Sequence, residues 1–426
     1  MKKKPFICIS KPRIAYDLLE AGAKEPLLIP LPEKVVLFIE GLLKYKDTHI
    51  KVGDKVKTGQ KLLLKEDINS YAISSVTGTI CSISPYSGDF GRNFAAILIE
   101  TAEKEEFDEQ FKTRCNDKSI KTADDFLSYL PGNPLFSTFK NTEKPIDTIV
   151  IFGGNSDVLI STNQYVIQTN ISDIISGIEV LKKITRVENV IIAVPRDLVS
   201  GFGHTGAKLV GVDLSYPSAH PNIIMQKELG KIVPAGKQAT DMGVVFFSAE
   251  AAASVGKAFL NERIPVDKIV SLVKKDGTKI LLKARLGTPL GHIFKTCGIS
   301  LSEKDRIIIG GPLTGTSVYS EEYPVLPDTD AVIVQDITQV SLVSDYPCIN
   351  CGECIRICPA NVPVNMLVRF LAAGRYMDAA DEYDLYSCID CGLCSFVCVS
   401  KIPVFQYIRL AKYELSRIHS AEAANE

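Results

Sequence analysis

The runs CINCGECIRICP at residues 348–359 and CIDCGLCSFVCV at residues 388–399 decide the fold class. Each run has the spacing C-x2-C-x2-C-x3-C. Three thiolates at this spacing on a tight loop bind three irons of a cubane 4Fe-4S cluster, and the fourth thiolate points to another cluster. Two structural zinc sites are the alternative, but zinc needs cysteine pairs separated by a longer loop, not four cysteines in eleven residues. The sequence therefore predicts two 4Fe-4S clusters.

The ligands of the two clusters are expected to cross between the runs. In two-cluster ferredoxins the fourth cysteine of each run ligates the cluster that the other run holds. Val399 stands where the first run has Pro359, but proline shapes the turn and is not a ligand. The expected ligands are Cys348, Cys351, Cys354 and Cys398 for the first cluster, and Cys388, Cys391, Cys394 and Cys358 for the second.

The 29 residues between Cys358 and Cys388 are too many for a minimal ferredoxin hairpin. VNMLVRFLAAG is typical of a helix ended by Gly374, and RYMDAADEYDLYS of a second helix. After the second run, Pro403 to Ile418 has apolar residues at helical spacing, which predicts an amphipathic helix. This helix is expected to pack on its own domain, and docking to a partner is the alternative. The module is therefore a helical two-cluster ferredoxin domain.

The rest of the chain predicts a multidomain α/β protein. Residues 49–83 alternate β-forming residues with turn tripeptides, which indicates short strands. IDTIVIF, ISDIISGIEVLKKI and VENVIIAVP alternate strand and helix patterns, which favours parallel strands. A further β-rich piece follows Ile264, with Asp276-Gly277 as a hairpin turn. The expected domains are 1–105, 120–260, 264–325 and 340–418.

Composition excludes some classes of partner and location. The chain has 48 basic and 50 acidic residues, so its net charge of -2 does not indicate a nucleic-acid partner. No apolar run reaches the roughly 18 residues that span a bilayer. The basic start of the chain is followed by an apolar stretch too short for a signal peptide, and the clustered cysteines indicate metal rather than disulfides. We expect a cytoplasmic protein that contacts a membrane only through a partner.

The C-terminal module, from CINCGEC to FQYIRLAK, resembles the cluster domain of the RnfC family, the C component of the Rnf electron transport complex. Upstream, HIKVGDKVKTGQ (49–60) with VTGTI (76–80) resembles the barrel-sandwich segment of that family. Its later α/β and β-grasp (SLBB) segments are similar to DMGVVFFSAEAAASVGKAF, LGTPLGHIFKTCGI and GGPLTG. The resemblance implies a barrel-sandwich domain at 1–105, a Rossmann-like domain at 120–260 and an SLBB domain at 264–325, ahead of the cluster domain at 340–418.

The same resemblance implies a function in electron transfer. RnfC is the peripheral subunit of a membrane ion-translocating complex that exchanges electrons between ferredoxin and NAD, and it binds NADH and FMN. The implied partners are the membrane subunits of such a complex and a ferredoxin or other redox carrier. The implied place is the cytoplasmic side of the membrane.

The chain departs from that family where FMN and NADH would bind. The glycine-rich flavin loop of the family corresponds here to LPGNPLFSTFK, residues 130–140. Only Gly132 remains as a glycine, and two prolines remove backbone N–H donors that a phosphate needs. Asn155 and Ser156 replace the carboxylates expected near the nicotinamide ribose, and Asp157 is the acid left nearby. The sequence thus argues against both cofactors. The rival functions are an NADH- and FMN-binding enzyme subunit and a docking scaffold without a substrate site.

Further motifs favour structural roles. Gly201, Gly203 and Gly206 form G-x-G-x-x-G, but residues intervene between the preceding strand and this loop, unlike in a dinucleotide site. The sandwich segment has Lys65 beside its tip at residues 66–69, which does not match a lipoyl carrier. No metal-binding spacing occurs among the five histidines, which are His49, His204, His220, His292 and His419. The four scattered cysteines are expected to be buried as small apolar residues; they are Cys8, Cys81, Cys115 and Cys297.

Overall fold

The computed structural model describes residues 13–20, 22–41, 48–64, 70–88, 91–203, 205–344 and 346–423. The chain divides into two compact units, which we treat separately. The cysteine unit comprises the described parts of Met1–Tyr16, Ser215–Gln238 and Val340–Glu426. The α/β unit comprises the described parts of Asp17–Leu214 and Ala239–Gln339. Residues 215–238 therefore belong with the cysteine motifs, although α/β-unit residues flank them in sequence.

A small antiparallel sheet begins the α/β unit. Its strands are β2 (Lys34–Glu40), β3 (Lys55–Val56), β6 (Gly78–Ser87) and β7 (Asn93–Thr101), in the order β2-β7-β6-β3, and β4 (Lys61–Leu63) pairs with β5 (Tyr71–Ile73). Alternate residues of β7, Ala95, Ile97 and Ile99, are fully buried, as period-two strands require. Gly53 and Gly59 have positive φ at the turns. The predicted short strands are confirmed.

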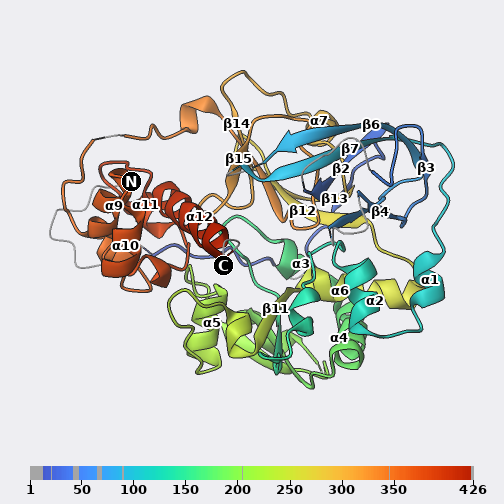
Figure 1. The fold of residues 1–426 in the computed structure, drawn as a ribbon, viewed down its shortest axis with the longest axis horizontal. Helices are drawn as coiled ribbons and strands as arrows, with labels where there is room; N and C mark the ends of the chain where they lie inside the picture. Colours follow the sequence, from blue (N-terminus) through green and yellow to red (C-terminus); the bar gives the residue numbers. More distant parts are fainter. Residues whose placement is uncertain are drawn as a thin grey trace. The chain divides into compact units, whose positions relative to one another are not determined.

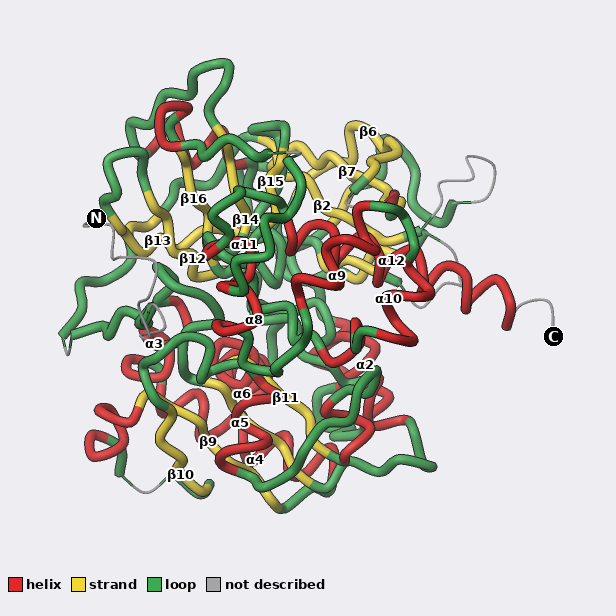
Figure 2. The backbone as a smooth tube through the Cα atoms, turned by 90° about the vertical axis from the view of Figure 1, so that its left-hand side faces the viewer, coloured by secondary structure: helices red, strands yellow, loops and turns green. Residues whose placement is uncertain are grey.

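A four-stranded parallel sheet with the order β10-β9-β8-β11 follows. Its strands are β8 (Thr148–Phe152), β9 (Asn189–Pro195), β10 (Lys208–Val212) and β11 (Val244–Ser248). The associated helices are α1 (Gln110–Arg114), α2 (Ile120–Leu127), η2 (Ser137–Lys140), α3 (Thr162–Thr169), α4 (Ile171–Thr185), η3 (Arg196–Gly201), η4 (Ala239–Met242) and α6 (Ala249–Asn261). Figure 2 shows α4 and α6 together near these strands. The predicted alternation of strand and helix is confirmed.

Two glycines, Gly177 and Gly256, allow α4 and α6 to pack closely. A Cβ on Gly177 would stand 2.0 Å from the Ala252 carbonyl oxygen, and a Cβ on Gly256 would stand 2.0 Å from the Asp173 carbonyl oxygen. Only glycine at both positions lets the two backbones lie this close. The helices thereby bury their apolar faces in one core with the parallel sheet.

The second sheet of the α/β unit is mixed, with the order β1-β13-β12-β16-β14-β15. Its strands are β1 (Leu27–Leu28), β12 (Asp267–Val273), β13 (Lys279–Arg285), β14 (Arg306–Ile309), β15 (Thr316–Val318) and β16 (Ala331–Gln335), accompanied by α7 (Leu290–Thr296) and η5 (Ile337–Gln339). The predicted Asp276-Gly277 turn joins β12 to β13, with Gly277 at φ 82°. β1 pairs in parallel with β13, which is about 250 residues later in the chain.

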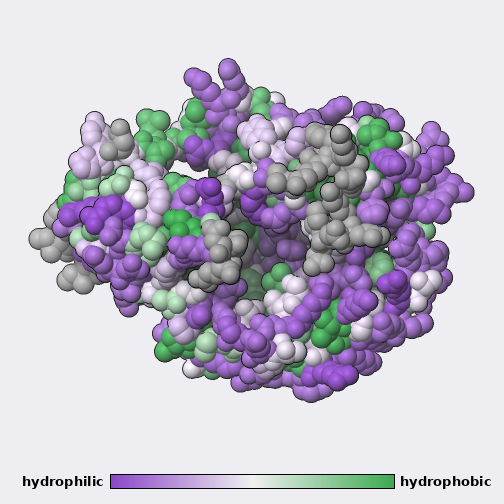
Figure 3. Space-filling model, viewed as in Figure 1, coloured by the Kyte–Doolittle hydropathy of each residue, from purple (hydrophilic) through white to green (hydrophobic). Residues whose placement is uncertain are grey.

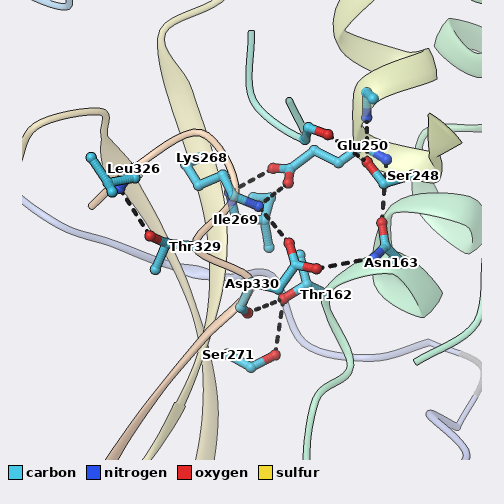
Figure 4. A network of polar contacts seen from close by, with 12 residues as sticks. Thr162, Asn163, Ser248, Glu250, Lys268, Ile269, Ser271, Leu326, Thr329 and Asp330 are labelled. Carbon is cyan, nitrogen blue, oxygen red and sulfur yellow. Dashed lines mark hydrogen bonds and ion pairs between the residues drawn. The ribbon is translucent and has the colours of Figure 1, made fainter. Parts of the chain in front are cut away.

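A buried charge network ties this sheet to α6 (Figure 4). Lys268 on β12 is fully buried, and its ammonium donates to the carboxylates of Glu250 and Asp330, the latter at 2.9 Å. Burial alone would lower the pKa of Lys268, but the two carboxylates reverse this and raise it, so the ammonium stays charged. The Asn163 side chain, on α3, contacts both residues. Its amide N–H donates to the Asp330 carboxylate, and its amide oxygen accepts from the Glu250 backbone N–H.

The cysteine unit is helical, as predicted. Its helices are α5 (Pro221–Glu228), α8 (Glu353–Ile357), α9 (Val364–Ala372), α10 (Tyr376–Glu382), η6 (Leu385–Ser387), α11 (Leu393–Val397) and α12 (Val404–Ala423). Figure 1 shows α9 to α12 gathered in one group at the red end of the colour scale. α9 ends before Gly374, which has φ 70° as a helix C-terminal glycine does. The apolar face of α12 (Phe405, Ile408, Ala411, Leu415) is buried in the core of this unit, so packing on its own domain is confirmed.

Candidate iron–sulfur site

The two cysteine motifs form an internal repeat with a period of 40 residues, which relates each cysteine of the first run to one of the second. The backbone follows the same repeat. Left-handed residues occur in pairs with closely matching φ: Asn350 and Asp390 (both 57°), Gly352 and Gly392 (76° and 71°), and Asn361 and Lys401 (56° and 55°). The short helices α8 and α11 follow the glycines. The two loops therefore present their cysteines from the same local fold.

Backbone N–H groups point at sulfur in both loops. The N–H of Asn350 lies 3.4 Å from the Cys348 Sγ, and the N–H of Asp390 lies 3.5 Å from the Cys388 Sγ. The left-handed conformation of residues 350 and 390 turns these N–H groups back toward the cysteine two residues earlier. Hydrogen bonds to sulfur stabilise negative charge on a metal-ligating thiolate. The loops are thus suited to hold clusters.

The sulfurs of the first run interact with one another. Burial raises the pKa of the Cys354 thiol to about 11, and negative charge on Cys348 and Cys351 adds to the rise. Such thiols ionise only beside a strong positive charge, which the irons of a cluster supply. The donor set therefore fits iron rather than free thiolates.

The sulfurs of the second run interact with one another and with Cys358. Burial raises the pKa of Cys391 to about 11, and Cys358 adds to that rise. Burial also raises the pKa of Cys394, with contributions from Cys388, Cys391 and Cys354. Cys358 thus lies within electrostatic reach of the second run, as cross-ligation requires. The role of Cys398 as a ligand stays a prediction, as does the full division of ligands between the clusters.

In the part of the chain that the structure describes, no three His, Cys, Asp or Glu side chains are grouped as ligands of one metal ion. A cubane cluster asks for a different arrangement, since each iron takes a single cysteine sulfur. None of the eight cysteines of the two runs forms a disulfide.

The second loop is held by residues that the sequence did not single out. The Tyr216 hydroxyl donates to the Cys391 carbonyl at 2.7 Å, and the Gly236 N–H donates to the Tyr386 carbonyl at 3.3 Å. Burial lowers the pKa of His220 to about 4, against the opposing effect of the Asp390 carboxylate, so His220 is neutral at pH 7. Tyr216, His220 and Gly236 all come from residues 215–238, and no local pattern marks them as neighbours of a loop about 170 residues later.

The loop at residues 130–140 does not form a phosphate cradle. The Gly132 N–H donates to the Pro327 carbonyl at 2.7 Å, and the Asn133 N–H donates to the Leu130 carbonyl at 2.9 Å. A Cβ on Gly132 would stand 2.4 Å from the Ala251 nitrogen, so this glycine serves close packing against α6. The N–H groups of Gly132 and Asn133 are thus already bonded within the protein. These two residues do not fit a cradle for the phosphate of FMN.

Asp157 is a buried support of another loop. Its Oδ2 accepts from the backbone N–H groups of Leu313 and Thr314 at 3.1 and 2.8 Å and from the Thr314 hydroxyl at 2.7 Å. Burial raises the pKa of Asp157 in spite of these hydrogen bonds. Asn155 is buried as well, and its amide donates to the Asp17 carbonyl at 2.9 Å. Both side chains are buried, at 2% exposure for Asn155 and 1% for Asp157.

A cleft of about 730 Å³ lies beside these loops in the α/β unit. Asn133 and Ser156 line it together with three carboxylates and one guanidinium, those of Glu40, Asp328, Asp330 and Arg92. Burial raises the pKa of Asp328, and the Asp330 carboxylate adds to the rise. Arg92 pairs with Glu40 at 3.0 Å, and Lys268 pairs with Asp330 at 2.9 Å, so two of these three carboxylates are compensated by a cation.

The remaining candidate residues have structural surroundings. Gly201 ends η3, and Gly203 and Gly206 lie between η3 and β10, so this motif precedes a strand and not a helix. Cys115 is buried, and Cys81 and Cys297 are half-buried. Cys8, His204, Lys65 and the tip at residues 66–69 lie outside the described residues.

Two known families match parts of this chain. The RnfC barrel sandwich hybrid domain matches residues 23–104, and the 4Fe-4S dicluster domain matches residues 347–402. The C component of the ion-translocating oxidoreductase complex of Buchnera aphidicola is 24% identical over 84% of this chain and 79% of its own length. The C component of the proton-translocating ferredoxin:NAD(+) oxidoreductase complex of Clostridium ljungdahlii is 26% identical over 93% and 92%. The resemblance to the RnfC family is confirmed.

Other relatives with the same description as the Buchnera protein are longer, and the chain spans 50 to 59% of their length. Among solved structures, an NAD+-reducing [NiFe]-hydrogenase in the H2-reduced state matches 71% of this chain and 62% of that chain. Its identity is 13% and its TM-score 0.43, which is too low to assign a fold.

None of the helices in the described part of the chain is long and apolar enough to cross a membrane. Hydrophilic residues cover much of the face shown in Figure 3, and apolar residues are scattered over it.

Proposed function

We propose that this chain is the electron-transfer subunit of a membrane-associated, Rnf-like redox complex and passes single electrons through two 4Fe-4S clusters. The observation that carries the proposal is the 40-residue repeat of cysteine motifs with matching backbone conformation. Similarity to the C components of ion-translocating oxidoreductase complexes over most of the chain supports it.

The protein's part in electron transfer is to hold, orient and insulate the clusters. When bound, the clusters supply one-electron chemistry that needs no proton or group transfer. Cys348, Cys351, Cys354 and Cys398 would hold the first cluster, and Cys388, Cys391, Cys394 and Cys358 the second. The apolar core around Leu367, Leu385 and Ile408 excludes water from the sulfurs that pack against it.

The chain would act on the cytoplasmic side of the membrane, bound to the membrane subunits of the complex and exchanging electrons with a ferredoxin or another carrier. In this assignment the barrel-sandwich domain lies within residues 1–105, and the SLBB domain begins at residue 264 and includes β16 beyond residue 325. Residues 120–260, without the segment 215–238 that belongs to the cysteine unit, form a Rossmann-like domain. Its strand order β10-β9-β8-β11 supports this, since it corresponds to the 3-2-1-4 order of dinucleotide-binding folds.

The chain would work without its own FMN or NADH. The bonded N–H groups of Gly132 and Asn133 support this, as do the two prolines of the 130–140 loop. The rival is a subunit that binds both cofactors and oxidises NADH itself. A docking scaffold without redox function is the second rival.

Anaerobic purification with analysis of metal, sulfide and flavin separates these functions. We expect about eight irons and about eight acid-labile sulfides per chain, since each set of four cysteines holds one cubane. We expect no stoichiometric FMN and little NADH-driven reduction of artificial acceptors. A colourless protein with stoichiometric zinc would overturn the cluster assignment. One FMN per chain that survives gel filtration would restore the NADH-oxidising enzyme.

Washing of membrane fractions tests the location. A peripheral subunit held by protein contacts should leave the membrane in high salt or carbonate. Release that requires detergent, or recovery only from the soluble fraction of an unwashed lysate, would contradict the peripheral location.

A further inference from the structure

The two halves of the 40-residue repeat differ in the charge beside their first cysteine. Position 350 in the first loop is asparagine, and position 390 in the second is aspartate. In the second loop the Asp390 Oδ1 lies 3.8 Å from the Cys388 Sγ. A carboxylate this close to a ligand sulfur repels the negative charge of a cluster.

A lysine forms an ion pair with that carboxylate. The Lys412 ammonium, on α12, donates to the Asp390 Oδ2 at 2.7 Å and to the Cys388 carbonyl at 2.7 Å. The Lys412 side chain is 23% exposed and the Asp390 side chain 44%, so solvent screens this ion pair in part. The lysine therefore fixes both the loop that carries Cys388 and the charge beside its sulfur.

The first loop has neutral residues at the two positions that correspond to Asp390 and Lys412. The residue 40 positions before Lys412 is Ala372, an exposed alanine on α9. The Asn350 side chain instead accepts a hydrogen bond from the Asn365 amide at 2.8 Å. An ion pair, Glu353–Arg356, does lie on α8, but it is an exposed i,i+3 pair that water and salt screen.

We infer that Asp390 and Lys412 are tuning residues that set the reduction potential of the second cluster separately from that of the first. The inference rests on the proposed function, because it requires a cluster at each cysteine set. Reduction adds one negative charge to a cluster, so a nearby ammonium favours the reduced state and a nearby carboxylate opposes it. In the protein the two charges offset each other. Removing either one alone must shift the potential, and the two shifts must have opposite signs.

The test is a redox titration of the anaerobically purified full chain, followed by EPR, after iron and sulfide have been measured. Asp390→Asn gives the second loop the residue of the first and leaves Lys412 uncompensated. It should raise one midpoint potential and leave the other in place. Lys412→Met leaves the carboxylate uncompensated and should lower the same potential.

Two further variants serve as matched controls. Asn350→Asp gives the first loop the acid of the second, without its lysine, and should lower the other potential. Arg417→Met removes a charge from α12 at an exposed pair with Glu414 and should move neither potential.

The outcomes separate this inference from the function on which it rests. Absence of iron and sulfide in the unaltered protein would refute the clusters themselves. With both clusters present, unchanged potentials in Asp390→Asn and Lys412→Met would refute the tuning role. Equal shifts of both potentials would refute it too, because they would show that the charge change acts on both clusters alike and not on the second cluster alone. Asp390→Asn preserves size and shape, so it keeps the test open should Lys412→Met fold poorly.

Discussion

Asp157 packs so closely on Gly311 that a Cβ at position 311 would stand 2.1 Å from the Asp157 Cβ. The glycine allows the turn at residues 311–314 to close over the carboxylate, which then accepts hydrogen bonds from Leu313 and Thr314. The resemblance to a known family drew attention to GGPLTG, and this contact gives a physical reason for its second glycine.

Gly311→Ala should destabilise the α/β unit. The added methyl group cannot fit unless Asp157 or the turn moves, and overpacking of this kind costs ~1–3 kcal/mol. The free energy of unfolding, measured by urea denaturation of the full chain, should fall accordingly. Gly201→Ala is the control, because a Cβ there meets no atom within 4 Å and should change little. Equal stability of the two variants would contradict the close packing.

Asp157→Asn should change how stability depends on pH. Burial raises the pKa of Asp157 above its ordinary 3.8, so the folded state binds this proton more tightly than the unfolded state does. The contribution of Asp157 is therefore fully present below pH 3.8 and is lost as pH rises through its folded pKa. The stability difference between the unaltered protein and Asp157→Asn should shrink over that range in urea titrations.

Asp276→Asn is the control of opposite sign. A hydrogen bond from the Thr278 N–H lowers the pKa of Asp276, so its contribution is present above pH 3.8 and is lost as pH falls through its folded pKa. Parallel pH profiles for the two variants would contradict the assignment for Asp157.

Lys268→Met should be strongly destabilising. It leaves Glu250 and Asp330 without their shared cation in a buried place, and breaking such a pair costs ~3–5 kcal/mol. Thermal or urea unfolding measures the loss. Lys283→Met is matched to it, since Lys283 pairs with Asp267 at 45% side-chain exposure and an exposed pair contributes ~0–1 kcal/mol. Comparable losses in both variants would show that the buried network is not what stabilises this part of the sheet.

Cys358→Ser should damage the second cluster more than the first, because cross-ligation assigns Cys358 to the second set. EPR spectra and iron content of the anaerobically purified variant report the loss. Cys115→Ser is the control outside the motifs and should keep the full iron content. Loss of the first cluster alone would reverse the division of ligands proposed above.

Local patterns predicted much of this fold. The repeated cysteine spacing predicted the cluster module, apolar spacing predicted α12, and Gly374 and Asp276-Gly277 marked a helix end and a hairpin. Each of these features depends on residues that are near one another in sequence. Over such short stretches the hydrophobic periodicity and the turn-forming residues indicate the local structure.

Long-range relationships could not be predicted in this way. The pairing of β1 with β13, the contact of Tyr216 with Cys391 and the burial of Lys268 between two acids all join distant residues. Nothing in the spacing of Asp157 distinguished a ribose ligand from a support of the 311–314 turn. Its role depends on which loop the fold brings to it.

The division of the chain at Tyr16, Leu214, Gln238 and Gln339 has a consequence for biosynthesis. Translation delivers residues 13–16 and 215–238 long before the cysteine motifs on which they pack, while domains generally begin to fold as they emerge from the ribosome. The α/β unit can close around its own segments once residue 339 has emerged, whereas Tyr216 must wait for Cys391, about 170 residues later. The cysteine unit is therefore completed later than the α/β unit, and a fragment that begins at residue 340 would lack residues 215–238, which hold its second loop.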